Sequence, residues 1–379
     1  MELNNIREHI DSIDREITRL FTERMDTVAQ VASAKKSTGK AIRDHARERT
    51  IINRVTEQAG DTYAPYVKDL YKLIFELSCN YQSTLMGYPT PLSAQLNEAC
   101  TQYAGKQLPK HALVACQGTE GAYAQQACEK LFEYPDILYF DSFDGVFNAV
   151  EQGMCEYGVL PIENSTAGSV TQVYDLMEKH SFHIVGARKL RIDHRLMRKP
   201  GASGPIREIV SHEQALRQCS QFFAAHPEYK PVKMANTAIA AEFASTTDRD
   251  DVAVIASKAC ASLYNLEIIG DSISNSQSNY TRFICISRKM EVYPHARKIS
   301  FTCNLPHEAG SLNSIISRLA IAGVNLCKLE SRPIPGREFE FRFFFDMEAD
   351  LHDPEIVKLV CELEGRTEHF VFLGAYEER

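Results

Sequence analysis

The chain has 379 residues, 44% of them hydrophobic, and a formal net charge of −8 at pH 7. A chain of this length exceeds one comfortable hydrophobic core, so two or three domains are expected. The negative charge argues against a nucleic-acid partner and against binding to a membrane surface.

The cysteines and the N-terminal residues favour a cytoplasmic protein. The 11 cysteines are scattered, without a C-x-x-C pair or the His/Cys spacing of a metal site, so we expect reduced thiols and no bound metal. The N-terminus lacks the basic start and apolar stretch of a signal peptide. No apolar run approaches membrane-spanning length, and we expect no membrane segment.

The first part of the chain predicts three helices with little hydrophobic interior of their own. A long helix begins near Leu3, with apolar residues in a 4-3-4-3 rhythm at Ile6, Ile10, Ile13 and Ile17. A second helix is expected over 46–59, and a third from residue 65, where proline is favoured at a first helical position. The length of the first helix predicts helix-on-helix packing between two chains.

Charged residues on the first helix suggest a site for a small anion. Arg24 and Lys35 lie about three turns apart on one face, roughly 16 Å along the axis, and both could lean onto one small dianion. Arg7 lies about 26 Å from Arg24 along the same rod, too far to reach that molecule, so it would serve a partner's site. Solvated charges on a coiled-coil-like dimer remain the alternative for each residue alone.

As a set, the polar residues of these helices resemble the complete active-site pattern of the all-helical chorismate mutases. The matching residues are Arg7, Arg24, Lys35, Asp44, Arg47, Glu48, Ser78 and Gln82. The resemblance covers residues 1–86 and implies an intertwined homodimer whose sites are shared between chains. It implies chorismate as substrate and prephenate as product, through a Claisen rearrangement that needs no cofactor.

The resemblance also implies a role for each residue. Arg7 and Arg24 would bind the two carboxylates of chorismate, and Arg47 would order the neighbouring carboxylates. Lys35 and Gln82 would donate hydrogen bonds to the ether oxygen as its bond breaks. The remaining three, Asp44, Glu48 and Ser78, would hold the ring hydroxyl and nearby groups.

Beyond a predicted linker at 87–110, short apolar runs alternate with helical stretches. The runs are His111–Cys116, Ile137–Phe140, Tyr157–Ile162, Ile184–Leu190, Ile209–Ser211, Val252–Ile255 and Phe283–Ser287. This alternation predicts a mainly parallel sheet with covering helices. Over 111–289 it would suit two small α/β lobes with a cleft between them.

Three polar loops border these runs, at 118–123, 161–170 and 278–283, where α/β proteins usually bind ligands. The segments Ile162–Ser165, Ser211–Ala215 and Thr281–Phe283 resemble prephenate dehydratase, and Thr-Arg-Phe is the most specific of them. The resemblance implies a two-lobed domain similar to periplasmic binding proteins. It implies loss of carbon dioxide and the ring hydroxyl from prephenate, giving phenylpyruvate.

Seven residues of these motifs are the dehydratase candidates. They are Thr281, Arg282, Phe283, Glu163, Asn164, Ser165 and Gln214. By resemblance Thr281 is the key residue, and we assign its hydroxyl a hydrogen bond to the leaving group. Arg282 is a candidate for the substrate carboxylates, and Glu163 for the proton source if burial raises its pKa. Asn164 and Gln214 would orient the substrate.

Residues 298–379 predict the order β-α-β-β-α-β, the ferredoxin-like α+β arrangement. Two segments resemble the phenylalanine-binding motifs of the ACT domain attached to prephenate dehydratases. Their residues are Gly310, Ser311 and Leu312 in the first, and Glu330, Ser331, Arg332 and Pro333 in the second. Phenylalanine between paired ACT domains would then bias the dehydratase cleft. A stabilising or dimerising module is the alternative.

The whole chain resembles the bifunctional chorismate mutase–prephenate dehydratase family of phenylalanine biosynthesis, with feedback inhibition by phenylalanine. The resemblance implies a homodimer or higher homo-oligomer in the cytoplasm. One alternative is a mutase fused to an arogenate dehydratase, whose substrate differs by one amino group; a carboxylate in the cleft would favour it. Another is a non-catalytic two-lobed protein that senses phenylalanine.

Overall fold

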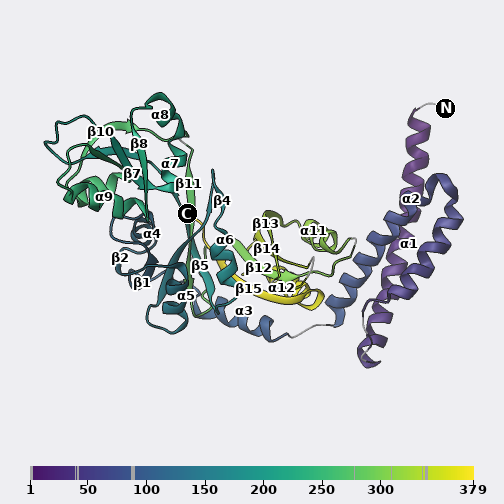
Figure 1. Ribbon diagram of the computed structural model, residues 1–379. Coiled ribbons are helices and arrows are strands. Elements are labelled where there is room, and N and C mark those ends of the chain that lie inside the picture. Colours follow the sequence, from purple (N-terminus) through teal and green to yellow (C-terminus); the bar gives the residue numbers. More distant parts are fainter. Residues whose placement is uncertain are drawn as a thin grey trace.

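A computed structural model describes residues 3–38, 40, 42–86, 90–276, 278–308, 310–334, 336–337 and 340–379. The molecule is elongated, with a helical domain at one end, a two-lobed domain at the other, and a smaller sheet domain between them (Figure 1).

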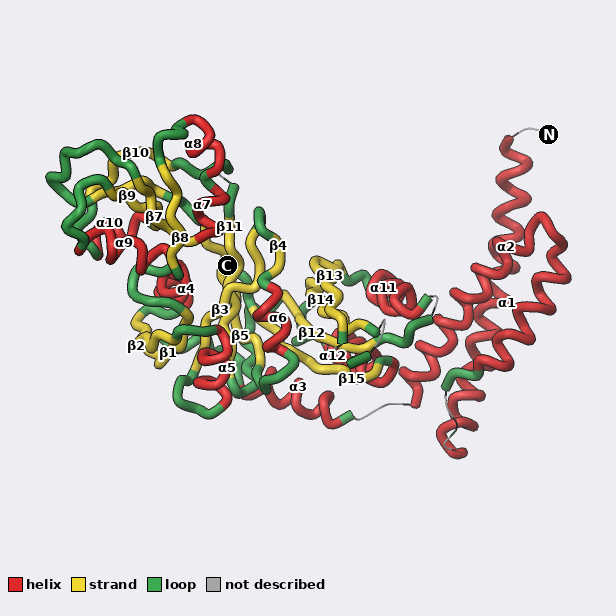
Figure 2. The backbone as a smooth tube through the Cα atoms, in the orientation of Figure 1, coloured by secondary structure: helices red, strands yellow, loops and turns green. Residues whose placement is uncertain are grey.

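The helical domain consists of α1 (Leu3–Thr38) and α2 (His45–Met86), which pack side by side (Figure 2). Gly60 has φ 70° and ψ 164°, so α2 is two helices joined across a kink. The predicted end of the second helix at residue 59 is confirmed, and the third helix begins directly after Gly60 rather than at Pro65. Glycine adopts the positive φ of the break without strain. None of the described helices has an apolar stretch long enough to cross a membrane.

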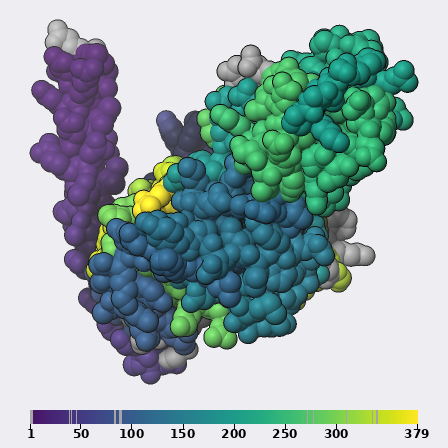
Figure 3. Space-filling view, turned by 90° about the vertical axis from the view of Figure 1, so that its left-hand side faces the viewer, coloured from purple at the N-terminus to yellow at the C-terminus, as the bar shows by residue number. Residues whose placement is uncertain are grey.

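The N-terminal part of α1 has an apolar stripe that the described residues leave largely exposed. Its large apolar side chains are 42–61% exposed at Leu3, Ile6, Ile10, Ile13, Ile17 and Leu20. In Figure 3 this part of the helix forms a separate rod. Buried residues of α1 begin only at Val28.

The segment predicted as a linker contains a helix, α3 (Pro91–Gln102), capped by the Thr90 side chain, which accepts from the Ser93 amide. Leu92, Leu96 and Ala99 are buried in the core of the third domain. The weak apolar periodicity of the segment concealed it, because only one face of a short helix is buried.

The first lobe of the middle domain is a mixed sheet in the order β2-β1-β3-β11-β5, with β4 paired to β3. Its strands are β1 (His111–Gln117), β2 (Tyr134–Phe140), β3 (Tyr157–Asn164), β4 (Gly168–Ser169), β5 (His183–Arg191) and β11 (Tyr280–Ser287), with helices α4 (Tyr123–Leu131), α5 (Phe143–Glu151) and α6 (Thr171–Met177). Its core extends into the third domain.

The second lobe has the order β10-β6-β9-β7-β8. Its elements are β6 (Arg195–Arg198), β7 (Glu208–His212), α7 (Glu213–Gln218), α8 (Ser220–Ala225), β8 (Lys230–Met234), α9 (Thr237–Thr246), β9 (Val252–Ala256), α10 (Lys258–Leu263) and β10 (Glu267–Ser272). The chain passes between the lobes after β5 and again before β11. The prediction of mainly parallel sheets is wrong, because β11 runs antiparallel to both β3 and β5, and β6 antiparallel to β9.

The third domain has the predicted β-α-β-β-α-β order of elements. They are β12 (Lys298–Asn304), α11 (Ser311–Ile321), β13 (Asn325–Pro333), β14 (Phe341–Glu348), α12 (Pro354–Arg366) and β15 (Glu368–Tyr376). The four strands form an antiparallel sheet in the order β13-β14-β12-β15.

The third domain docks on the first lobe through β15 and the C-terminal residues. The Ala187 amide donates to the Glu377 carbonyl (2.9 Å), and the Arg379 amide donates to the Ala187 carbonyl (3.1 Å), so the C-terminal residues extend the sheet beyond β5. At Gly374 a β-carbon would lie 2.1 Å from the Ile184 carbonyl oxygen. Glycine is therefore required where β15 passes β5.

We predict that Gly374→Ala destabilises the protein by roughly 3 kcal/mol, because the new methyl group overlaps a backbone carbonyl that cannot rotate away. Thermal unfolding of the variant and of Gly365→Ala makes a matched comparison. Gly365 lies in α12 with nothing within 4 Å of an added β-carbon. Its substitution should be neutral or stabilising by about 0.5–1 kcal/mol. Equal unfolding temperatures for the two variants would contradict the close approach.

Candidate functional sites

The helical domain brings together polar residues of α1 and α2. The Arg24 guanidinium donates to the Ser78 hydroxyl, which itself donates to the Ile74 carbonyl (2.6 Å). Gln82 Nε2 donates to the Ser78 carbonyl (3.2 Å), and both residues are buried. Burial lowers the pKa of Arg24, and no carboxylate of the described residues forms an ion pair with it. A half-buried cation beside buried neutral donors is an arrangement suited to an anion.

Four other predicted mutase residues lie near the end of α1 and the start of α2. Lys35, in the last turn of α1, donates through its ammonium to the carbonyl of Ile42, which lies between α1 and α2. The Asp44 carboxylate accepts from the Arg47 amide (3.0 Å), so it caps α2, and both side chains are exposed. Glu48 pairs with Arg43 (3.3 Å), a residue that the sequence analysis did not select, and Arg43 also pairs with Glu76 (2.6 Å).

Arg7 does not join this cluster. It is exposed near the start of α1, beside the apolar stripe, while Arg24 lies against Ser78 farther along the helix. Seven of the eight predicted residues thus lie on the packed part of α1 and the two ends of α2, and the eighth lies beyond it.

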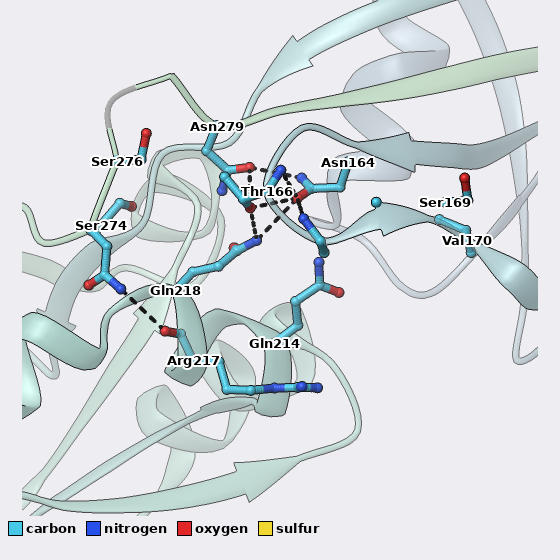
Figure 4. A pocket seen from close by; sticks show the side chains of 13 residues that line it. Asn164, Thr166, Ser169, Val170, Gln214, Arg217, Gln218, Ser274, Ser276 and Asn279 are labelled. Carbon is cyan, nitrogen blue, oxygen red and sulfur yellow. Dashed lines mark hydrogen bonds between the residues drawn. The ribbon is translucent and has the colours of Figure 1, made fainter. Parts of the chain in front are cut away.

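The middle domain has a cleft of about 540 Å³ between its lobes, lined by polar side chains (Figure 4). The first lobe contributes Asn164 and the following loop, and the second contributes Gln214, Arg217 and Gln218 of α7. Asn279, on the segment that leads back from the second lobe into β11, also lines the cleft.

Asn164 is the centre of the hydrogen bonds in this cleft. Its Nδ2 donates to the Thr281 hydroxyl (2.9 Å) and to Asn279 Oδ1 (2.8 Å). Its Oδ1 accepts from the Thr166 hydroxyl (2.7 Å) and from the amides of Thr166 and Ala167. Asn164 and Thr281 are both buried, so the amide fixes the position of the threonine hydroxyl.

Four residues of this network, Thr166, His194, Gln218 and Asn279, were not among the predicted site residues. Gln218 Nε2 donates to the Thr166 hydroxyl (3.0 Å), and its Oε1 bonds to His194 Nε2 (2.9 Å). Burial lowers the pKa of His194, which favours the neutral imidazole. Asn279 Nδ2 is buried and has no partner among the described residues. The four-residue spacing of Gln214 and Gln218, one helical turn, was the available signal for Gln218.

Arg282 and Glu163 do not line the cleft, and their predicted roles require correction. Arg282 is buried and pairs with Asp346 (2.5 Å) and Glu378 (2.6 Å) of the C-terminal region. Glu163 pairs with Lys328 of β13 (2.9 Å). Both side chains follow or precede a cleft residue directly in a strand, so the alternation of the strand turns them to the opposite face.

The remaining candidates have structural surroundings. Phe283 is buried in the core of the first lobe. The Ser165 hydroxyl donates to the Ser278 carbonyl (3.0 Å) and accepts from the Tyr280 amide (2.9 Å), joining the loop after β3 to the start of β11. Gln214 is half-buried at the start of α7 and faces the cleft.

The two predicted phenylalanine motifs are only partly separated in the chain's own fold. Ser311 and Leu312 line a cavity of about 330 Å³ at the start of α11, and Gly310 precedes them with φ 97°. In the second motif, two residues face the middle domain: Glu330 accepts from the Ser169 hydroxyl (2.8 Å), and Arg332 pairs with Asp175 (2.8 Å). The other two, Ser331 and Pro333, lie opposite Phe343 and Phe341 of β14, which line the cavity.

Comparison with known proteins assigns two regions of the chain to families. The family model for chorismate mutase type II matches residues 6–83, and that for prephenate dehydratase matches residues 114–291. The bifunctional chorismate mutase/prephenate dehydratase of Enterobacter agglomerans is 32% identical over 384 residues, covering 98% of this chain and 95% of the relative. Arogenate dehydratase 4 of Arabidopsis thaliana is 33% identical, covering 69% of this chain and 67% of the relative.

A solved prephenate dehydratase from Arthrobacter aurescens, in complex with L-Phe, has the same fold over 70% of this chain and 89% of its own, with a TM-score of 0.63 and 24% identity. The chain is therefore an enzyme with two active sites, an isomerase site on its helices and a lyase site in its middle domain. It belongs to the bifunctional chorismate mutase/prephenate dehydratase family, and it converts chorismate to prephenate and prephenate to phenylpyruvate.

We predict that Gln218→Ala lowers the dehydratase rate about tenfold or more, because Thr166 and Asn164 lose a donor that fixes them, and a buried hydrogen bond left unmade costs about 1–3 kcal/mol. The mutase rate should not change. Gln221→Ala, at an exposed position of α8, is the control. Both rates are measured by following each substrate separately. A normal dehydratase rate for Gln218→Ala would show that the network is not needed.

Proposed function

We propose that each mutase site is completed by Arg7 of a second copy of the chain. Arg24 and Arg7 would bind the two carboxylates of chorismate, with Arg47 ordering the carboxylates beside them. Lys35 and Gln82 would donate to the ether oxygen, where negative charge develops as the bond breaks. Asp44, Glu48 and Ser78 would hold the ring hydroxyl and nearby groups.

The support for a shared site is the incompleteness of the single chain. The apolar stripe of α1 is exposed in the same part of the helix that carries Arg7. Burying six large apolar side chains against a second copy would gain about 1.5–3 kcal/mol for each one fully buried. A two-fold dimer of intertwined helices covers both stripes at once. Larger assemblies are compatible with this contact.

We predict that Lys35→Ala lowers the rate of chorismate rearrangement at least about 100-fold, because a donor to the breaking ether bond is lost. Lys36→Ala, at the exposed neighbouring position, should be close to normal. Arg7→Ala should also be inactive. After unfolding and refolding together, Arg7→Ala and Lys35→Ala chains should regain about a quarter of the normal rate, because each mixed dimer has one intact site. No recovery in the mixture would contradict the shared site.

In the dehydratase cleft we propose that Thr281 hydrogen-bonds the departing ring hydroxyl of prephenate while the carboxylate leaves as carbon dioxide. Aromatisation of the ring drives this step, so the enzyme mainly has to fix the substrate and assist the leaving group. Asn164 orients the Thr281 hydroxyl through their 2.9 Å hydrogen bond. Asn279 Nδ2 and Gln214 would donate to the bound substrate.

Arg217 is the candidate for the carboxylates of prephenate, in place of Arg282. It is the only cation among the described residues that line the cleft. None of these lining residues is Asp or Glu. A carboxylate would be needed to pair with the ammonium group of arogenate, so this composition favours prephenate over arogenate as substrate.

We predict that Thr281→Ala abolishes the formation of phenylpyruvate while the mutase rate stays normal, because the two sites lie on separate domains. Thr281→Ser keeps the hydroxyl and should retain measurable activity. Supplying prephenate directly and measuring phenylpyruvate tests both variants. Persistent phenylpyruvate formation by Thr281→Ala would remove Thr281 from the mechanism.

For the C-terminal region we propose a ferredoxin-like ACT domain that binds phenylalanine and inhibits the dehydratase. Domain boundaries at 1–86, 111–289 and 298–379 follow, with α3 attached to the ACT core. Support comes from the element order and from the relative solved with L-Phe. Gly310, Ser311 and Leu312 would form one wall of the phenylalanine site. Ser331 and Pro333, opposite Phe343 and Phe341 of the cavity wall, would contribute to a site between paired ACT domains, while Glu330 and Arg332 contact the middle domain.

A cytoplasmic location is part of this proposal. All 11 cysteines, each within the described part of the chain, are free thiols, and most are buried. This state is typical of proteins in reducing compartments.

A further inference from the structure

The strand pair β3–β11 faces two domains at once. In the antiparallel register, Thr281 lies opposite Asn164, and Arg282 lies opposite Glu163. Successive side chains of a strand point to opposite faces. Asn164 of the first pair lines the dehydratase cleft with Thr281 on the same face, and the second pair is turned to the third domain.

Arg282 is tied to the third domain by ion pairs and hydrogen bonds. It lies 2.5 Å from the Asp346 carboxylate of β14 and 2.6 Å from Glu378, and it donates to the Tyr376 hydroxyl (2.6 Å). The side chain is only 7% exposed. A buried guanidinium with two carboxylate partners has a narrowly defined position, because moving it away from either partner would leave a buried charge uncompensated.

Glu378 links Arg282 to two further elements. It pairs with Lys189 of β5 (2.7 Å) and with Lys298 of β12 (2.8 Å). Burial opposes ionisation, but hydrogen bonds from both lysines and the charge of Arg282 hold the pKa of Glu378 at about 2. The carboxylate is therefore charged at neutral pH. It lies between β5 of the first lobe and β12 of the third domain.

Lys328 of β13 connects the third domain to β3, the other strand of the pair, through Glu163. Its ammonium lies 2.9 Å from the Glu163 carboxylate and donates to the Ser169 hydroxyl (3.0 Å). Ser169 lies on β4 and lines the cleft. The third domain thus touches a residue of the cleft wall as well as the strands behind Asn164 and Thr281.

We propose that these five residues, Arg282, Asp346, Glu378, Glu163 and Lys328, form an ionic lock through which the third domain acts on the dehydratase cleft. This inference rests on the proposed inhibition by phenylalanine. Ligand binding that shifts β13 and β14 moves the partners of Arg282 and Glu163, and with them the neighbouring Thr281 and Asn164. The domains also meet through apolar contacts at Phe344 and Leu373. Such contacts are non-directional, so they fix the positions of individual side chains less closely than the ion pairs do.

The magnitudes are compatible with such a device. Allosteric coupling typically changes an affinity by about 5–150-fold. Removing one carboxylate partner of the buried Arg282 leaves its charge uncompensated, which is a large disturbance compared with such a coupling. A change in a single partner should therefore be enough to weaken the coupling.

The test compares Glu378→Gln with Glu377→Gln in the full-length protein. Glu377 is adjacent in sequence but pairs with Arg379 at the surface (2.7 Å). Lys328→Met is the second lock variant, on the opposite strand. For each protein we would measure phenylalanine binding by calorimetry, inhibition of the dehydratase by phenylalanine, and the unfolding temperature.

We expect both lock variants to bind phenylalanine but to need about tenfold more of it for half-maximal inhibition, or to lose inhibition altogether. Glu377→Gln should behave like the unmodified protein. Unchanged inhibition in Glu378→Gln and Lys328→Met would overturn the lock, as would loss of phenylalanine binding in both variants at normal unfolding temperatures. An unmodified protein that phenylalanine does not inhibit would refute the proposed regulation itself.

Discussion

The alternation of side chains along β3 and β11 is the constraint on which the dehydratase and its connection to the third domain depend. One face of this pair carries Asn164, which lines the cleft, and Thr281, which is hydrogen-bonded to it, and the other presents Glu163 and Arg282 to the third domain. A shift of one residue in either strand would exchange the two faces. The site and the domain contact are thus fixed by the same backbone hydrogen bonds.

The helical domain differs from the dehydratase, because the first half of α1 lacks a hydrophobic partner among the described residues of its own chain. Its buried residues begin at Val28, while the apolar stripe from Leu3 to Leu20 is exposed. The polar cluster around Ser78 is already formed within one chain. A second copy would therefore supply Arg7 and the missing hydrophobic burial together.

Much of the fold was predictable from periodicity and motifs. The long α1, the order of elements in the third domain and the grouping of Asn164 with Thr281 all followed from the sequence. Strand direction did not, because a fully buried run such as β11 has the same apolar composition in parallel and antiparallel sheets. The helix α3 was missed because its buried face has only three residues in the core, Leu92, Leu96 and Ala99.

The roles of individual charges were the least predictable. Arg282 follows Thr281 directly, and a motif does not state which of two adjacent side chains faces the ligand. The partners that decide this, Asp346 and Glu378, lie far along the chain. Likewise Gln218 and Asn279 belong to the site because the two lobes meet at the cleft, and this meeting is not encoded in either local motif.

The most direct test of this account is a time course of chorismate, prephenate and phenylpyruvate, with the purified chain and chorismate as the only substrate, in the absence and presence of phenylalanine. The account predicts phenylpyruvate as the final product without phenylalanine, and accumulation of prephenate when phenylalanine is added, because only the second site is inhibited. Prephenate accumulating without phenylalanine would contradict the dehydratase activity. Phenylpyruvate formation that phenylalanine does not slow would contradict the regulatory role of the third domain.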